Sequence, residues 1–389
     1  MIRSLKGKRV VVTNWRCPDH SMAGGAERYA WEFSTALNAA GARVDLVTAR
    51  EPGQPRREQR GDITIHRGGG RFGYYAYAAA FLLKHRGAID AVVDAESGIP
   101  EFSPLWVGRG VPVVLLMHHV HLDQFATHFP KPLASVGRIL EGRVMPRVYA
   151  GRRALAVSDS TRAEMIDQLG WTDPIDVLVN GADSPLDIKV DPADTVDRIV
   201  VLGRLARHKR VDLVIRAVAA LLPKRPTLHL DIIGSGPERA ELERLVDDLR
   251  VEKAVTFHGY APETTKADLV AHGRLHVCAS DAEGWGQVVI EAASYGVPTV
   301  ARQVPGLRGS VRPDETGWLI DEPAKPDLAT TQARLTVAID EALGELEDDL
   351  RREEIAVQCR EWAREFSWEQ MHEGAVRVVT AAIDREESR

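Results

Sequence analysis

The sequence predicts an α/β protein built from two Rossmann-like domains. Short runs of β-branched residues alternate with amphipathic helical patterns along the chain, and one polar segment interrupts this alternation near the middle. Strand–helix–strand alternation produces parallel sheets with helices on both faces. A length of 389 residues suits two domains of ordinary size better than one.

Five strands are expected in the first half of the chain. They are the apolar runs KRVVVT (8–13), RVDLVT (43–48), AIDAVVD (88–94), VPVVLLM (111–117) and ALAVS (154–158). Between the first two strands, apolar residues from Ala26 to Ala40 recur at intervals of three and four, which predicts one buried face of a helix. Gly41 provides the stop signal of that helix.

The polar segment at 184–197 contains two prolines and four aspartates, and it predicts an interdomain linker. We therefore expect an N-terminal domain over residues 1–183 and a C-terminal domain over 198–367. The elements expected in the second domain are strands at 198–203, 227–234, 254–260, 275–280 and 298–301, and helices near 211–222, from Glu238 and near 286–295.

Composition excludes several classes of protein. A net charge of -6 argues against nucleic acid as the main partner, because a protein that follows phosphates needs a basic surplus. The three cysteines form no CxxC pair, which fits a reducing compartment. The first residues turn polar too quickly for a signal peptide, and no run approaches the roughly 20 apolar residues of a membrane helix. These features favour a cytoplasmic protein.

Two cations follow the first predicted strand of the second half. Parallel sheets bind ligands at the carboxyl ends of their strands, so Arg204 and Lys209 could together hold a diphosphate. They could equally be ordinary solvated cations. The next strand ends in IIGSGPE (232–238), where Gly234 and Gly236 would let the backbone approach a ligand, although loop geometry alone could explain both glycines.

The segment DAEGWGQVVIEAASYGVP (281–298) carries the strongest local signal. Glu283 and Glu291 stand on either side of a glycine-containing helix start, where Gly284 and Gly286 free backbone N–H groups that can bind anions and hydroxyls. Fixed carboxylates suit sugars because each accepts hydroxyl hydrogen bonds in defined directions. The alternative is two solvated glutamates beside a turn.

A histidine cluster follows the strand predicted at 111–117. His118, His119 and His121 could suggest a metal, but Asp123 is the only carboxylate nearby in the sequence, so we expect no metal here. The arginine-rich segment 137–153 could touch a membrane or an anionic acceptor. A surface helix is the favoured interpretation, so membrane association is possible but not favoured.

A series of motifs resembles glycosyltransferase family 4 over nearly the whole chain. In order, they are GGAERY (24–29), PVVLLMH (112–118), AVSDSTR (156–162), NGAD (180–183), VVLGRLARHK (200–209), IIGSGPE (232–238), VTFHGY (255–260), EGWGQVVIEAASYGVPTVA (283–301) and TGWLI (316–320). The resemblance implies the GT-B architecture, in which two Rossmann-like domains face each other across a cleft. It also implies transfer with retention of the anomeric configuration.

The resemblance assigns the nucleotide part of a donor site to the second domain. Arg204 and Lys209 match the pair that holds the donor diphosphate, and Glu291 matches the carboxylate that binds the ribose. Gly236 lies in a matching glycine loop. Tyr260 stands at a position near the base of the nucleotide.

The donor sugar is expected at Glu283 and the backbone that follows it through Gly284, Trp285 and Gly286. Trp285 is bulkier than the usual neighbour of the first glutamate. The stretch PGLRGS (305–310) lacks a glutamate that the family often has beyond this helix. Both departures bear on the identity of the donor sugar.

In the first domain, Gly25 matches a glycine whose N–H approaches the donor phosphate, and His118 matches a histidine that faces the reacting sugar. His119 and His121 are candidates for acceptor binding. The C-terminal segment, about 368–389, resembles a helix that crosses back to the first domain.

The resulting prediction is a metal-independent, hexosyltransferase-type enzyme that uses a nucleoside-diphosphate sugar as co-substrate and needs no other cofactor. His118, Glu283, Arg204 and Lys209 would be catalytic, with front-face attack assisted by the leaving phosphate. The alternatives are a nucleotide-sugar epimerase or hydrolase of the same fold, or a non-catalytic nucleotide-sugar-binding protein. No GxGxxG follows the first strand, which disfavours an NAD oxidoreductase.

The acceptor, the donor base and the donor sugar stay open at this stage. The acceptor could be a small metabolite, a natural product or a lipid-linked glycan, and the base uridine, guanosine or deoxythymidine. The stretches 14–23 and 61–76 are expected to be acceptor loops, whose sequences carry no transferable code.

Overall fold

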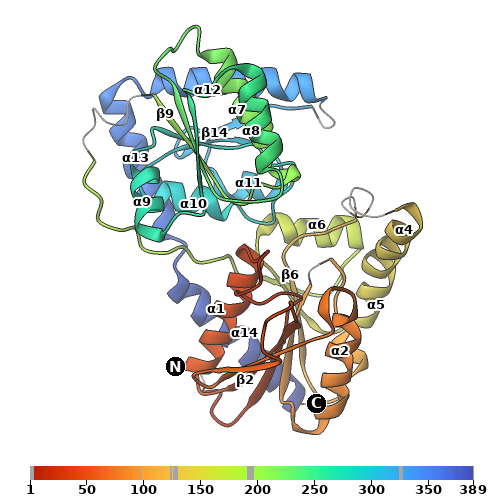
Figure 1. Ribbon diagram of the computed structural model, residues 1–389. Coiled ribbons are helices and arrows are strands. Elements are labelled where there is room, and N and C mark those ends of the chain that lie inside the picture. The colour runs from red at the N-terminus through yellow and green to blue at the C-terminus, as the bar shows by residue number, and fades with distance from the viewer. Residues whose placement is uncertain are drawn as a thin grey trace. The chain divides into compact units, whose positions relative to one another are not determined.

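The computed structural model describes residues 4–96, 98–122, 125, 130–190, 197–323 and 327–388. The chain divides into two compact units. Unit 1 comprises Met1–Gly181 together with Trp368–Arg389, and unit 2 comprises Ala182–Ser367. Each unit contains one sheet with helices packed on both of its faces (Figure 1).

Unit 1 has an eight-stranded sheet in the order β3-β4-β2-β1-β5-β6-β7-β8. Its strands are β1 (Arg9–Thr13), β2 (Arg43–Ala49), β3 (Arg57–Arg60), β4 (Ile63–Gly68), β5 (Ala91–Glu96), β6 (Val113–Met117), β7 (Arg153–Ala156) and β8 (Ile175–Val177). The pairs are parallel except for β3 with β4, which is an antiparallel hairpin at the sheet edge.

Helices cover both faces of this sheet. They are α1 (Gly25–Ala39), α2 (Gly70–His85), α4 (Lys131–Ile139), the π-helix η3 (Leu140–Val144), α5 (Met145–Val148), α6 (Asp159–Leu169) and α14 (Trp368–Glu387), with short 3-10 turns η1 (Arg86–Ala88) and η2 (Ser103–Leu105). The side chains of alternate residues of β1 lie on opposite faces of the sheet. Val10 and Val12 pack in the core that contains α1 and α14, and Val11 packs in the core that contains α2.

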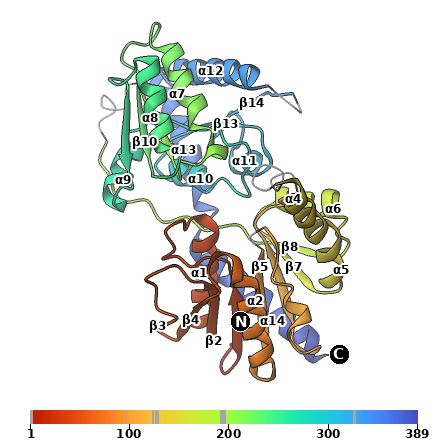
Figure 2. The same ribbon diagram turned by 45° about the vertical axis from the view of Figure 1, so that its right-hand side comes forward.

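The C-terminal helix α14 completes unit 1. Figures 1 and 2 show it beside α1, and buried residues of both helices belong to one hydrophobic cluster. From α1 these include Tyr29 and Phe33, and from α14 Met371 and Val379. A segment more than 300 positions away in sequence thus supplies part of the core on one face of the first sheet.

Unit 2 has a six-stranded sheet in the order β11-β10-β9-β12-β13-β14, parallel throughout. Its strands are β9 (Arg198–Leu202), β10 (His229–Ile233), β11 (Val255–Gly259), β12 (Leu275–Cys278), β13 (Thr299–Arg302) and β14 (Gly317–Ile320). Its helices are η5 (a 3-10 turn, Arg207–Lys209), α7 (Val211–Leu221), α8 (Arg239–Leu249), α9 (Glu263–Ala271), α10 (Gln287–Ser294), α11 (Pro305–Ser310), α12 (Leu328–Glu345) and α13 (Asp349–Arg364).

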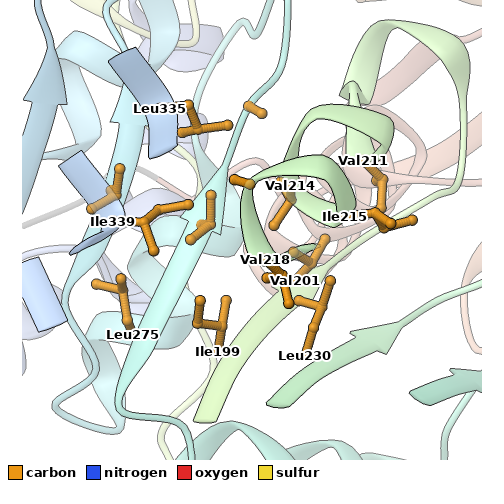
Figure 3. Close-up of a cluster of buried hydrophobic side chains, with 14 of the residues drawn as sticks. Ile199, Val201, Val211, Val214, Ile215, Val218, Leu230, Leu275, Leu335 and Ile339 are labelled. Carbon is orange, nitrogen blue, oxygen red and sulfur yellow. The ribbon is translucent and has the colours of Figure 1, made fainter. Parts of the chain in front are cut away.

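The main core of unit 2 lies between the centre of this sheet and the helices α7 and α12. Figure 3 shows Ile199 and Leu275 from the central strands, Val218 from α7, and Leu335 and Ile339 from α12 in one cluster. All five side chains are fully buried, and burying a side chain of this size contributes about 1.5–3 kcal/mol. This packing holds the strand ends of unit 2 in a rigid frame.

The predicted elements of both halves occur in the structure, with one clear exception. The helix expected between the first two strands is α1 (Gly25–Ala39), and the strands expected at 43–48 and 198–203 are β2 and β9. The interpretation of 61–76 as an acceptor loop is wrong, because this stretch forms β4 and the first part of α2. Arg67 explains the error: it lies within β4, yet it is only 2% exposed and forms ion pairs with Glu58 and Asp19.

The arginine-rich segment 137–153 is divided between α4, the π-helix η3 and α5. The exposed apolar residues Leu133, Val136 and Ile139 lie on α4. Within the part of the chain that the structure describes, no helix has both the length and the apolar character that a membrane span requires.

Candidate functional site

Three loops of unit 2 are tied together at the carboxyl edge of its sheet. They follow β9, β10 and β12, which include the central strands of the sheet. The Leu205 N–H donates to the Ser235 carbonyl oxygen at 3.0 Å, and the Asp281 N–H donates to the His208 carbonyl oxygen at 2.7 Å. Backbone hydrogen bonds therefore fix the β9 loop, which carries Arg204 and Lys209, against both of its neighbours.

The glycines of the β10 loop are explained by packing. Gly234 has φ of +145°, and a Cβ at this position would lie 1.9 Å from the carbonyl oxygen of Gly203. A Cβ at Gly236 would lie 2.3 Å from the carbonyl oxygen of Leu205. Both glycines are required because the β10 loop lies directly against the β9 loop. Loop geometry thus suffices as the reason for these two glycines.

Lys209 and Glu283 form the central charged pair of this edge. The Lys209 ammonium, in η5, donates to the Glu283 carboxylate, and the Ser280 hydroxyl donates to the same carboxylate oxygen at 2.8 Å. Burial, the largest single effect, lowers the pKa of Lys209, but the charge of Glu283, the nearby Cys278 and the hydrogen bond to Glu283 together outweigh it, so that the pKa is raised overall. Lys209 is therefore held as a cation in a fixed position.

Arg204 lies in the same loop and is half-buried. Its charge acts on Lys209 in the direction that lowers the pKa of Lys209, although burial and the carboxylate of Glu283 have larger effects. The structure therefore brings the two predicted cations near each other, with Lys209 paired to Glu283.

Glu291 lies in the second turn of α10 and forms an ion pair with Lys266 of α9. Lys266 also contacts Glu263 at 2.9 Å, and burial of its ammonium is outweighed by these carboxylates, so that its pKa is raised. Lys266 was not among the residues predicted from the sequence. No spacing rule connects it to Glu291, because the two residues meet only when α9 and α10 pack beside each other.

The loop that joins Glu283 to α10 is closely packed. A Cβ at Gly286, the residue before α10, would lie 2.3 Å from the Ser310 hydroxyl, so a side chain there would require Ser310 to move. The ring of Trp285 packs against Phe366 with centroids 5.1 Å apart, and it contributes to the packing at the edge of the main core. The bulk of Trp285 is thus accommodated by packing. In the sequence, Gly284 separates Glu283 from Trp285.

Tyr260, expected near the base of a nucleotide, comes directly after β11 and is 89% exposed. Its ring is therefore accessible for stacking against a flat ligand. In unit 2, the structure brings Arg204, Lys209 and Glu283 into one cluster, and Glu291 is paired with Lys266.

In unit 1, His118 is the first residue after β6 and is only 8% exposed. Its ring meets the edge of Tyr29 with centroids 5.4 Å apart, and the Thr161 hydroxyl donates to its backbone carbonyl at 3.1 Å. Burial, assisted by the charge of His121, lowers the pKa of His118 to about 4. A neutral imidazole can polarise or accept a hydrogen bond, but it supplies no positive charge at neutral pH.

The neighbouring histidines differ from His118 in their surroundings. His119 and His121 stack with ring centroids 3.8 Å apart. His121 lies between two carboxylates: its Nδ1 is 3.3 Å from Glu96 Oε2 and 3.5 Å from Glu141 Oε1. Burial lowers the pKa of His121, but these carboxylates outweigh the effect and raise it to about 10.

Glu96 and Glu141 were not among the residues predicted from the sequence. Asp123 is the one carboxylate beside the histidines in the sequence and lies outside the described residues, whereas these two residues, distant in sequence, reach His121 in space. Glu96 is the last residue of β5, so the strand-end rule used for the second half would have found it. Glu141 had no comparable signal.

Gly25 is the first residue of α1, and a Cβ at this position would meet no atom within 4 Å. The carboxylate of Glu27 accepts from the Gly24 N–H at 2.6 Å and from Arg16 Nε at 2.7 Å, which satisfies one donor of the helix start. Space therefore remains beside Gly25 for a ligand that approaches its backbone.

Two family models match the chain in succession. Residues 23–184 match the model described as Glycosyltransferase Family 4, and residues 186–343 match the model described as Glycosyl transferases group 1. A curated relative, the D-inositol 3-phosphate glycosyltransferase of Rhodococcus erythropolis, is 29% identical over 298 residues. That alignment covers 69% of this chain, and the chain spans 63% of the length of that relative.

Solved structures show the same fold. Sucrose-phosphate synthase from Thermosynechococcus elongatus is 21% identical, with a TM-score of 0.75, over 94% of this chain and 96% of that one. Anabaena HepE in complex with UDP-glucose is 16% identical, with a TM-score of 0.68, over 96% of this chain and 99% of that one. Both are similar to this chain over nearly its whole length.

Proposed function

Because the chain belongs to the family 4 glycosyltransferases and has their GT-B fold, we propose that it transfers a sugar, with retention, from a nucleoside-diphosphate donor to an acceptor hydroxyl. The observation that carries this proposal is the cluster of Arg204, Lys209 and Glu283 at the strand ends of unit 2. A carboxylate beside two cations offers partners for both a sugar and a diphosphate.

Arg204 and Lys209 hold the diphosphate in this proposal. Negative charge grows on the leaving phosphate as the glycosidic bond breaks, so two cations fixed before the reaction stabilise the transition state more than the ground state. The loop hydrogen bonds of Leu205 and His208 support this role, because they fix the positions of both cations before a ligand arrives.

Glu283 and Glu291 divide the carbohydrate contacts. Glu283 accepts from hydroxyls of the donor sugar, beside the cation that neutralises the diphosphate. Glu291 accepts from the ribose hydroxyls of the nucleotide, and Lys266 holds its carboxylate in place. The exposed ring of Tyr260 stacks near the base, and the backbone of Gly284, Trp285 and Gly286 borders the sugar.

From unit 1, His118 faces the reacting sugar, and the Gly25 N–H binds a donor phosphate oxygen. The buried, neutral state of His118 suits a hydrogen bond to a sugar hydroxyl better than proton donation. His119 contacts the acceptor in this proposal. His121, also expected to bind the acceptor, is held by the carboxylates of Glu96 and Glu141.

We propose a UDP-hexose as the first donor to test, because the similar HepE structure contains UDP-glucose. The donor site needs no divalent metal, since Arg204 and Lys209 supply the charge that a metal would otherwise provide. The acceptors to test with it are small metabolites, natural products and lipid-linked glycans.

The test is calorimetric titration with UDP, GDP and dTDP, followed by assays of nucleotide release from the corresponding donor sugars. One nucleoside diphosphate should bind with the same affinity with and without EDTA. Arg204→Ala should weaken this binding by about ten- to a hundredfold, which corresponds to the loss of a charge-assisted hydrogen bond. Arg207→Ala is the matched control, because Arg207 is an exposed cation of the adjacent turn.

Two results would contradict the proposal. One is the absence of binding with every nucleoside diphosphate. The other is an Arg207→Ala variant that loses as much affinity as Arg204→Ala, since the effect would then come from general surface charge. Slow release of nucleotide without any acceptor, together with an unchanged rate when acceptors are added, would favour the hydrolase alternative.

A further inference from the structure

Three ionisable side chains of unit 1 converge on one point near the end of β5. Glu96 is the last residue of β5, and it pairs in register with Met117 at the end of β6. His121 lies in the segment that follows β6, and Glu141 lies in the π-helix η3. One carboxylate oxygen of each glutamate and one imidazole nitrogen lie within 4.8 Å of one another.

The distances in this cluster are longer than those of good hydrogen bonds. His121 Nδ1 lies 3.3 Å from Glu96 Oε2 and 3.5 Å from Glu141 Oε1, whereas charge-assisted N–H···O bonds are about 2.7–2.9 Å long. Ligand atoms bound tetrahedrally to zinc at about 2.0–2.2 Å lie about 3.3–3.6 Å apart. Both measured distances fall in that second range.

Burial makes the cluster costly unless something neutralises it. The side chains of Glu96 and Glu141 are 0% exposed, and that of His121 is 14% exposed. Among the described residues, neither carboxylate oxygen of Glu96 has a hydrogen-bond partner, nor do Glu141 Oε2 and His121 Nδ1. Buried carboxylates are normally paired or bound to a metal, and here two of them share a single imidazole as ion-pair partner, at distances too long for good hydrogen bonds.

The local backbone holds Glu141 in this position. Five residues, Leu140–Val144, adopt a π-helix just before Pro146, and such turns within helices are often associated with functional sites. The His121 backbone N–H donates to Glu141 Oε1 at 2.6 Å, which fixes the glutamate against the segment that follows β6. The cluster is therefore built from three separate elements that are locked to one another.

We propose that Glu96, His121 and Glu141 bind one divalent transition-metal ion, with zinc as the preferred ion. Two carboxylates and one imidazole form a donor set that suits zinc and similar ions, and two carboxylates balance the charge of a divalent cation. The partly exposed His121 leaves room for water as a fourth ligand. Magnesium, which prefers oxygen ligands, should bind more weakly.

The ion would have a structural role. It joins the end of β5, the segment after β6 and the π-helix, and His118 lies at the start of the middle element. It would therefore position the segment that carries His118. All three ligands belong to unit 1, whereas the side chains proposed to bind the donor diphosphate, those of Arg204 and Lys209, belong to unit 2. Gly25, whose backbone N–H is proposed to contact a phosphate oxygen, starts α1 and is not part of the three elements that the ion would join. Loss of the ion should consequently leave nucleoside-diphosphate affinity unchanged.

The first test measures metal content. The full chain is purified without a metal-affinity tag, dialysed against metal-free buffer and examined by elemental mass spectrometry, with one equivalent of zinc per chain expected. The stripped protein is then titrated with Zn²⁺, Mn²⁺ or Mg²⁺ while its thermal midpoint is followed. Binding to the folded state should raise the midpoint by mass action, most strongly with Zn²⁺.

Variants show whether these three residues are the ligands. Glu96→Gln, Glu141→Gln and His121→Ala should each weaken Zn²⁺ binding by more than about a hundredfold, since loss of a ligand should exceed the effect of losing an outer-shell partner. His66→Gln is the matched control, because His66 belongs to the same unit, its Nε2 pairs with Asp45 Oδ1 at 2.6 Å, and it is not one of the three proposed ligands. It should retain the metal.

Circular dichroism verifies that each variant is folded, and nucleoside-diphosphate binding verifies that unit 2 is unaffected by the substitutions in unit 1. A wild-type protein that carries no metal and shows no midpoint change with Zn²⁺ would overturn the proposal. So would retention of Zn²⁺ by all three ligand variants, because the ion would then bind elsewhere.

Discussion

The ion pair between Lys209 and Glu283 makes a specific prediction about two substitutions in one cluster. Arg204→Ala removes a cation from the proposed diphosphate site, whereas Glu283→Gln removes the carboxylate that neutralises Lys209. Affinity for the bare nucleoside diphosphate should therefore fall in the first variant. In the second it should stay the same or rise, because Lys209 is then no longer shared with a carboxylate.

The expected magnitudes follow from the contacts. A hydrogen bond to a charged group contributes about 1.5–3 kcal/mol, so Arg204→Ala should weaken nucleotide binding by about ten- to a hundredfold or slightly more. The side chains of Lys209 and Glu283 are 23% and 13% exposed, so the loss of their pair should also lower the free energy of unfolding, by about 1–3 kcal/mol. Glu283→Gln should thus lower stability and turnover while nucleotide affinity is kept.

The assay is isothermal titration of each variant with the nucleoside diphosphate that the wild type binds, combined with steady-state turnover of the complete donor. Urea unfolding measures the stability term separately. If Glu283→Gln loses the bare nucleotide as severely as Arg204→Ala, then Glu283 acts on the nucleotide, and the proposed division between sugar and diphosphate contacts is incorrect.

Three further predictions concern other parts of the molecule. His118→Ala should lower kcat well over tenfold while nucleoside-diphosphate affinity stays nearly constant; normal turnover would reduce His118 to a packing residue. Lys266→Met should weaken nucleotide binding only while Glu291 is present. A double-mutant cycle with Glu291→Gln should therefore give strongly non-additive changes in affinity. Additive changes would show that Lys266 does not act through Glu291. Burial lowers the pKa of His276 to about 3, with its Nδ1 3.0 Å from the Thr299 hydroxyl. Between about pH 6.5 and pH 3, the unfolded chain therefore binds a proton at His276, whereas the folded chain does not. The free energy of unfolding should fall as pH falls through this range, by up to about 1.4 kcal/mol per pH unit. Urea unfolding of His276→Gln over the same range should show a correspondingly smaller slope, and an unchanged slope would exclude His276 as its source.

Elements with an apolar, β-branched core could be predicted from the sequence. Strands such as β1 and β9 are buried on both faces, so they appear as continuous apolar runs. Strand β4 could not be recognised, because Arg67 lies within it and is neutralised only by Glu58 and Asp19, which are brought to it by the tertiary structure. Strand β8 has three half-buried residues and gives no pattern.

The same distinction applies to the candidate site. Seven residues separate Glu283 from Glu291, and the two glutamates flank the start of α10. Both could therefore be recognised from the local sequence. Their partners Lys209 and Lys266 come from other elements, and only Lys209 was singled out, because it follows a strand. Glu96 and Glu141 meet His121 from distances of 25 and 20 positions, with no shared motif. Contacts made by packing leave no spacing signal in the sequence.

The position of α14 in unit 1 has a consequence for the order in which the chain folds during synthesis. Unit 2 is continuous in sequence, whereas unit 1 needs Trp368–Arg389, which leave the ribosome after all of unit 2. Until then, the faces of Tyr29 and Phe33 that pack in the cluster with Met371 and Val379 have no covering helix. The N-terminal half therefore keeps an uncovered apolar surface while the second half is synthesised, and a surface of this kind is prone to aggregation.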